Sequence, residues 1–229
     1  APIWGFEDVL FKGDSLSLPQ PFETYVMENI LFKISFPAEF HAQTAVEAAV
    51  SLHSEIKDRI NEIESIEITT HESAIRIISK VGELNNPADR DHCLQYMVAI
   101  GLLKGNLVAE DYEDDVAKDP RVDELREKMI INEDKRYSKE YLEADKRSIA
   151  NRIKVHFKDG TATNEVEVEY PIGHKRRRKE GIPILEKKFK DNLSITYDES
   201  KSNEIFELCM DQRKLEETSV ADFQQLLSK

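Results

Sequence analysis

The stretch 86–100, NPADRDHCLQYMVAI, joins a short polar segment to a helix that is apolar on almost every side. A helix with so little polar surface is expected to lie in a core. Its first turn nevertheless carries four charged or titratable side chains, Asp89, Arg90, Asp91 and His92, and Tyr96 follows one turn later. Because unpaired charges cost several kcal/mol to bury, this cluster is either a cap with its own salt bridges or a functional site.

The composition narrows the classes of protein to consider. The chain has 229 residues, of which 40% are hydrophobic and 34% are charged, and its net charge is −13. A charge of this sign argues against nucleic acid or an anionic membrane as the main partner. No apolar run approaches the roughly 20 residues that span a bilayer, and the first residues do not resemble a secretory signal. A start at Ala1 rather than Met suggests a processed chain or a fragment.

A basic cluster and two cysteines bear on the partners and the compartment. The cluster is HKRRRK at residues 174–179. It could bind a polyanionic small molecule or an acidic protein surface, or it could be a solvated loop without a function. Cys93 and Cys209 lack the spacing of metal ligands and are too few for a disulfide framework. Free thiols of this kind fit a reducing compartment.

The hydrophobic pattern predicts an α+β fold. Alternation predicts strands at 32–36 and 64–70, and a hairpin of 153–157 with 166–170 that turns at Asp159-Gly160. Helical periodicity and capping residues predict helices at 43–60, 92–104, 120–129, 183–193, 199–215 and 219–227. The middle of the chain is therefore α+β with helical extensions. The first 30 residues are too short to fold alone and are expected to complete a core made elsewhere.

Few motifs in the sequence carry chemistry. There is no glycine-rich phosphate loop, no nucleophile elbow and no histidine pair with zinc spacing. His41 lies where a predicted strand gives way to a helix, and there it could exchange a proton near neutral pH. The alternative is that His41 caps the helix or lies on the surface. Three other histidines, His53, His71 and His156, fall on faces of predicted elements and receive no role.

Five blocks of this sequence carry a resemblance to a known family: 32–41, 85–103, 111–114, 146–151 and 170–174. They are similar to the MmgE/PrpD family, which includes the 2-methylcitrate dehydratases. The resemblance extends over essentially the whole chain. It covers only the C-terminal half or so of a family member, because the N-terminal helical domain of the family has no counterpart in this sequence.

The resemblance implies a two-domain architecture. Residues 1–30 would be the tail end of a larger all-helical domain, residues 31–175 a central α+β lid domain, and residues 176–229 C-terminal helices that return to the helical domain. It also implies a homodimer that works without a metal, an iron–sulfur cluster or another cofactor. The two separated cysteines cannot supply the thiolates that ligate such a cluster.

The resemblance implies an activity as well. Family members of this kind remove water from 2-methylcitrate to give 2-methyl-cis-aconitate in propionate breakdown, by a metal-independent acid/base elimination. The compartment would be the mitochondrial matrix or the bacterial cytoplasm. Two alternatives stay open. One is a sister reaction on the same scaffold, citrate dehydration or cis-aconitate decarboxylation. The other is a non-catalytic interaction module that uses the basic cluster 174–179.

A tricarboxylate substrate calls for cationic and hydrogen-bonding side chains around it. The predicted catalytic residues are Lys33, His41 and Tyr96, and the predicted substrate-binding residues are Asp89, Arg90 and His92. Lys33 and Tyr96 match family positions, although Lys33 stands one residue further from the Phe36-Pro37 pair than the family pattern has it. Which group is acid and which is base stays undecided, because part of the site would lie in the N-terminal domain. The chain alone is therefore expected to be inactive.

Overall fold

The computed structural model describes residues 3–18, 21–22 and 30–228. The chain divides into two compact units, Ala1–Ile30 and Leu31–Lys229. The first unit contains helix α1 (Phe6–Leu10), of which no residue is buried. Part of the predicted segment 1–30 lies outside the described residues. The predicted division into three parts stays a prediction.

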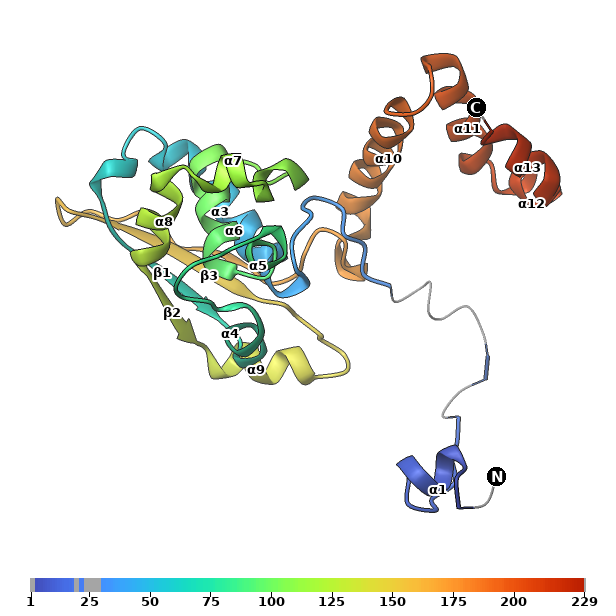
Figure 1. Ribbon diagram of the computed structural model, residues 1–229, viewed down its shortest axis with the longest axis horizontal. Coiled ribbons are helices and arrows are strands. Elements are labelled where there is room, and N and C mark those ends of the chain that lie inside the picture. Colours follow the sequence, from blue (N-terminus) through green and yellow to red (C-terminus); the bar gives the residue numbers. More distant parts are fainter. Residues whose placement is uncertain (1–2, 19–20, 23–29, 229) are drawn as a thin grey trace. The chain divides into compact units, whose positions relative to one another are not determined.

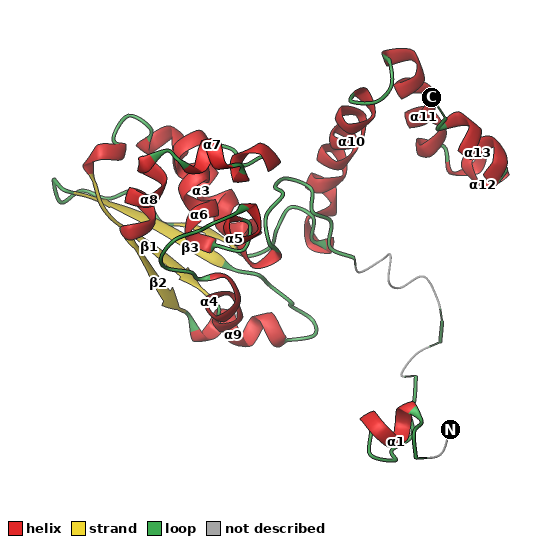
Figure 2. Cartoon of the chain, in the orientation of Figure 1, coloured by secondary structure: helices red, strands yellow, loops and turns green. Residues whose placement is uncertain are grey.

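The second unit is built on a mixed sheet, as Figure 2 shows. Its strands are β1 (Ile63–Thr70), β2 (Met129–Glu133), β3 (Asn151–Phe157) and β4 (Val166–Val168), in the order β2-β1-β3-β4. β1 is parallel to β2 and antiparallel to β3, and β3 is antiparallel to β4. Parallel neighbours need a long crossover rather than a tight turn. Several helices occupy the crossover between β1 and β2.

The sheet has one covered face and one polar face. Along β3, the apolar side chains Ile153, Val155 and Phe157 are buried, and they alternate with half-buried polar ones. This period of two is expected where helices cover only one face of a sheet. Helix α3 (Gln43–Ile56) packs against β3 and β4, and helix α6 (Leu94–Lys104) packs on α3. Figure 1 shows both helices over the same face.

Helix α6 confirms the prediction of a buried helix at 92–104. Every residue from Leu94 to Leu102 is buried. The helix ends at Gly105, whose φ of +67° is left-handed, a conformation that glycine adopts without strain. A side chain at Gly101 would bring its Cβ to 3.0 Å from the Cβ of Ala49, so the small residue allows α3 and α6 to approach closely. With helices packed on a mixed sheet, the second unit confirms the predicted α+β class.

The remaining described elements are short helices and the C-terminal helices. The 3-10 helices are η1 (Phe40–Ala42), η2 (Ile60–Glu62), η3 (Ala109–Tyr112) and η4 (Lys175–Arg177). The α-helices are α4 (Glu72–Ile78), α5 (Pro87–Arg90), α7 (Asp114–Ala117), α8 (Pro120–Glu127), α9 (Lys135–Leu142), α10 (Arg178–Ser194), α11 (Glu199–Met210), α12 (Gln212–Glu217) and α13 (Val220–Leu226). The predicted hairpin and the predicted strand at 64–70 are confirmed by β3, β4 and β1.

Several local predictions are wrong. Residues 32–36 form no strand: Ile34 and Phe36 are buried alternately, but the backbone bonds to a side chain, since the Gln43 amide donates to the Phe36 carbonyl at 2.9 Å. Helix α8 ends at Glu127, and Met129 instead begins β2, which pairs with β1. Helix α9 had no counterpart in the predicted elements.

A further correction concerns the basic cluster, which is not a solvated loop. His174 is buried and accepts a hydrogen bond from the backbone N–H of Arg176, which caps η4. Arg177 donates to Glu47 at 2.8 and 2.9 Å and to the carbonyl of Tyr170 at 2.7 Å. The carboxylate bond to Glu47 raises the pKa of Arg177. Arg177 therefore joins the start of α10 to α3.

The packing of α6 predicts the cost of a cavity. Ile100→Ala should lower the free energy of unfolding by about 2–5 kcal/mol, because the fully buried side chain leaves a void that its neighbours fill only in part. Ile130→Ala is the matched control, since Ile130 on the edge strand β2 is half exposed and should cost less than about 1 kcal/mol. Urea unfolding of both variants measures the difference. Equal losses would contradict the assigned core.

Candidate functional site

His41 lies in η1, and a carboxylate holds its ring. Glu39 caps η1 by accepting the His41 backbone N–H at 2.8 Å, and its carboxylate lies 2.8 Å from His41 Nδ1. A carboxylate can only accept, so Nδ1 carries a proton and Nε2 is the acceptor of the neutral ring. Burial opposes the charge on Glu39, but the hydrogen bonds that it accepts from His41 outweigh this effect and lower the pKa of Glu39.

Tyr141 of α9 lies at the other nitrogen of the same ring. Its hydroxyl is 3.2 Å from His41 Nε2, and the two ring centroids are 5.5 Å apart. The sequence separation between the two residues is large, so tertiary packing alone brings them together. Glu39, His41 and Tyr141 thus form a line of hydrogen bonds that ends at a phenol.

His71 completes this cluster from the end of β1. Its ring stacks on Tyr141 with centroids 4.6 Å apart and planes at 18°, and it lies 5.1 Å from the His41 ring. The side chain is fully buried, and neither ring nitrogen has a hydrogen-bond partner among the described residues. Burial, assisted by His41, lowers its pKa to about 4, so the ring is neutral at pH 7. An unpartnered buried polar group of this kind calls for an explanation.

The backbone at His41 is clamped from two sides. The Asn151 amide donates to the His41 carbonyl at 2.8 Å and to the Thr44 hydroxyl at 2.8 Å. The Thr44 hydroxyl in turn donates to the Ile149 carbonyl. The Gln43 amide donates to the carbonyl of Ala38 at 2.8 Å, which holds the segment before η1. The start of α3 is thereby fixed against β3, and His41 is fixed with it.

Several polar groups of the block around α5 bond to one another or to neighbouring segments. Asn86 accepts the Asp89 backbone N–H at 2.9 Å as the N-cap of α5. Arg90 is buried, donates to the Tyr112 carbonyl at 2.6 Å and lies 2.8 Å from Asp114. His92 is exposed and pairs with Asp91 at 2.6 Å. Because its charge also lowers the pKa of Glu39, His92 is the member of the block within electrostatic reach of the His41 cluster.

Tyr96 is connected to the His41 segment through a second tyrosine. Its hydroxyl donates to the Asp111 carbonyl at 2.5 Å, and burial raises its pKa to about 12. Its ring stacks on Tyr112 at 6.1 Å, and the Tyr112 hydroxyl donates to the Pro37 carbonyl at 2.9 Å. Lys33 is exposed, with Nζ 5.2 Å from the Phe40 ring.

The segment 33–41 brings together only some of the predicted residues, since Asp89, Arg90 and His92 bond elsewhere. It carries Lys33 and His41, and Tyr112 ties it to Tyr96. The roles predicted for Lys33, His41, Tyr96, Asp89, Arg90 and His92 stay predictions. Sequence reasoning missed Glu39, His71 and Tyr141. A His directly after a strand, in Thr70-His71-Glu72, was the available signal for His71, because functional side chains often follow a strand.

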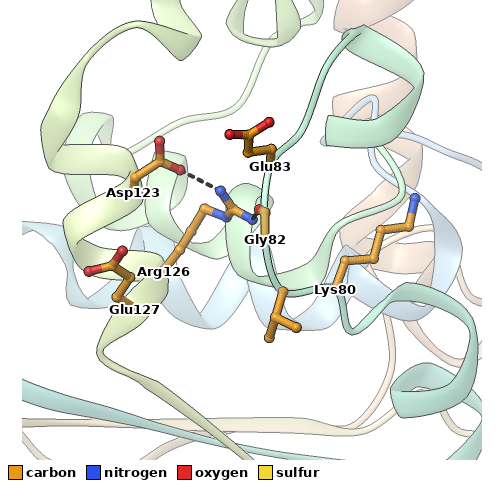
Figure 3. A pocket seen from close by; sticks show the side chains of 7 residues that line it. Lys80, Gly82, Glu83, Asp123, Arg126 and Glu127 are labelled. Atoms are coloured by element: carbon orange, nitrogen blue, oxygen red, sulfur yellow. Dashed lines mark hydrogen bonds and ion pairs between the residues drawn. The ribbon is translucent and has the colours of Figure 1, made fainter.

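Figure 3 shows a cavity elsewhere in the second unit, of about 300 Å³, lined by Lys80, Val81, Gly82, Glu83, Asp123, Arg126 and Glu127. The Arg126 guanidinium pairs with Asp123 and donates to the Gly82 carbonyl at 2.8 Å. Its charge is thus satisfied within the fold, and the lining contains no predicted site residue. Over residues 3–18, 21–22 and 30–228, no group of three or more His, Cys, Asp or Glu side chains is placed to hold a metal ion.

The second unit is thus an α+β domain in which Glu39, Tyr141 and Asn151 hold His41 in place. A model of the MmgE/PrpD C-terminal domain family matches residues 36–212, and the chain therefore belongs to this family. Within the described part of the chain, each helix is too short or too polar to cross a membrane.

Three relatives give the degree of similarity. The chain is 54% identical over 226 residues to 2-methylcitrate dehydratase of Escherichia coli, covering 97% of this chain and 47% of that protein. It is 55% identical over 208 residues to the mitochondrial 2-methylcitrate dehydratase of Yarrowia lipolytica, covering 90% and 40%. It is 53% identical over 205 residues to the probable 2-methylcitrate dehydratase of Saccharomyces cerevisiae, covering 87% and 40%. The chain spans about half the length of the curated relatives it matches.

Neutral His71 predicts a pH-dependent loss of stability. Between its pKa of about 4 when folded and 6.5 when unfolded, the unfolded chain binds a proton that the folded chain does not. Stability is therefore fully present above pH 6.5 and falls as the pH drops towards 4.

His71→Phe keeps a ring but cannot be protonated, so it is the matched variant. From pH 7 to pH 5 the wild type should lose about 2 kcal/mol more unfolding free energy than His71→Phe, measured in urea. His174, whose pKa burial also lowers to about 4, contributes equally to both proteins. The same pH dependence in both would show that His71 is not buried as described.

Proposed function

We propose that this chain is the C-terminal half of a carbon–oxygen lyase that removes water from 2-methylcitrate to give 2-methyl-cis-aconitate. The observation that carries the proposal is the similarity to relatives of that name, 54% identical across 97% of this chain in one case. The hydrogen-bonded cluster at His41 supports it from the chemical side, because dehydration requires a positioned group that exchanges protons.

His41 is the proposed centre of proton transfer. Removing water means taking a proton next to a carboxylate and helping the hydroxyl group to leave. Glu39 fixes the His41 tautomer and would stabilise the imidazolium that forms when Nε2 accepts a proton. Lys33 and His92 are exposed enough to meet substrate carboxylates. Charge-assisted bonds of that kind are the strong ones in carboxylate recognition.

The other predicted residues are proposed to form one wall of the pocket. Tyr96 would contribute its hydroxyl by exchanging the Asp111 carbonyl for the substrate. Arg90 and Asp89 would set the wall's position and charge, since both already bond within α5 and its neighbours. The opposite wall would come from an N-terminal helical domain. The relatives are about twice as long as this chain, so their length could include such a domain.

Exposed apolar surface supports a larger assembly. Trp4 and Phe6 in the first unit are 83% and 58% exposed. In the second unit, α10 and α11 border an apolar groove of about 470 Å³ whose lining includes Phe189 and Met210. Contiguous apolar surface of this kind usually lies in an interface. We propose the helical domain as its cover and a homodimer as the complete enzyme. We propose the bacterial cytoplasm or the mitochondrial matrix as the compartment of this enzyme. One relative comes from a bacterium, and another is named mitochondrial.

The proposal predicts loss of turnover in two variants of the full-length protein. His41→Ala and Tyr96→Phe should each lower kcat for 2-methylcitrate by about 100-fold or more, because each removes a group that moves or orients a proton. The urea unfolding midpoint reports whether folding is intact. His156→Ala, on the polar face of the sheet, is the control and should keep full turnover. Normal turnover in both site variants would remove the site assignment.

A second prediction concerns the isolated 229 residues. Purified alone, they should not dehydrate 2-methylcitrate, because one wall of the proposed pocket is absent from them. The measurement compares their rate with that of a full-length protein containing this chain. A comparable rate would show that the pocket is complete within residues 1–229 and that the two-wall account is wrong.

A further inference from the structure

We propose that Tyr141 is the terminal group of a Glu39–His41–Tyr141 proton relay, so that His41 reaches the substrate through this phenol. The inference rests on the proposed dehydratase function and deepens it by naming the atom that meets the substrate proton. It gives a role to a residue that no sequence motif singled out.

The direction of the hydrogen bonds sets the direction of the relay. Glu39 accepts from Nδ1, so Nε2 of the neutral ring can only accept. The Tyr141 hydroxyl, 3.2 Å from Nε2, is then the donor. A hydroxyl that donates to a carboxylate-held imidazole is the arrangement that activates serine in hydrolases. Here a tyrosine stands in the position of the serine.

The surroundings hold the phenol in that position. The His71 ring stacks on the Tyr141 ring, and Asn151 clamps the backbone of His41. His71 lies 5.1 Å from His41 and stays neutral, because burial lowers its pKa to about 4. It therefore places no second positive charge beside the imidazolium that the relay creates. Tyr141 itself is only partly buried, so its oxygen is not sealed within the fold.

The proton balance closes within the relay. Tyr141 passes its hydroxyl proton to His41 Nε2 while its oxygen takes the proton from the substrate carbon, and the electron pair of the broken C–H bond forms the new double bond. The C–O bond breaks with its electron pair on oxygen. The imidazolium proton then returns through Tyr141 to the departing hydroxide, which leaves as water. His41 and Tyr141 end in their starting states.

The test compares Tyr141→Phe with wild type in the full-length protein. Loss of the hydroxyl should lower kcat by about 100-fold or more with the unfolding midpoint retained. Tyr197→Phe is the matched control, because the Tyr197 hydroxyl donates to the Leu227 carbonyl in the C-terminal helices. It should turn over normally. The rate of the wild type should fall in heavy water, because the exchangeable Tyr141 hydroxyl proton moves to His41 as the C–H bond breaks, and this solvent isotope effect should be lost in Tyr141→Phe. Turnover of Tyr141→Phe within about threefold of wild type would overturn the relay.

A second measurement needs no turnover. Diethyl pyrocarbonate acylates an unprotonated imidazole nitrogen, and peptide mapping reports the rate at His41. Without the Tyr141 hydroxyl on Nε2, the rate should rise about fivefold, the effect of losing one ordinary hydrogen bond. An unchanged rate would overturn the Tyr141–His41 contact even in an active protein. A wild type that reacts as expected but dehydrates nothing would instead remove the proposed function.

Discussion

The burial of α6 is the constraint on which the second unit depends. A helix that is apolar on all sides is unstable when exposed to water, and every residue of this one from Leu94 to Leu102 is buried. Close approach to α3 is possible because Ala49 and Gly101 face each other, with a Cβ at Gly101 meeting that of Ala49 at 3.0 Å. The phenol that α6 itself carries into this core, that of Tyr96, has its hydroxyl bonded to the Asp111 carbonyl. The polar block itself lies outside this helix, because Asp89 and Arg90 belong to α5 and α6 begins only at Leu94.

The sheet explains why the polar cluster forms where it does. β1 and β3 are antiparallel, with Thr69 opposite Arg152, so the end of one strand meets the start of the other. His71 follows β1, and Asn151 begins β3. The start of α3 crosses the same end and brings His41 between them, since Asn151 bonds to its carbonyl. Chain segments far apart in sequence thereby converge on one histidine.

Sequence reasoning recovered the elements whose pattern is local. The continuous apolar run of α6, the alternation of β1 and the hairpin turn at Asp159-Gly160 each predicted their structure directly. The edge strand β2 was not predicted. Ile130 and Asn132 are exposed, and Met129 fitted the pattern of the preceding helix. Alternation at 32–36 predicted burial correctly but not strand pairing, because the Phe36 carbonyl accepts from the Gln43 amide rather than from a neighbouring strand.

The candidate site was only partly predictable, for a different reason. Glu39 and His41 are two residues apart, so their pairing is within reach of a sequence argument. The contacts of His41 with His71 and Tyr141 depend on how β1 and α9 pack, and this packing could not be predicted from the sequence alone. His71 carried no periodic signal at all. Apart from its place directly after a strand, what marks it is complete burial without hydrogen-bond partners among the described residues.

The central claim is that this chain supplies the proton-exchanging wall of a tricarboxylate dehydratase. The most direct measurement is the turnover of 2-methylcitrate, citrate and cis-aconitate by one purified full-length protein that contains this chain, with products identified by mass spectrometry. The account predicts loss of water from 2-methylcitrate as the fastest reaction. No turnover of any of the three, or decarboxylation of cis-aconitate as the main reaction, would contradict it.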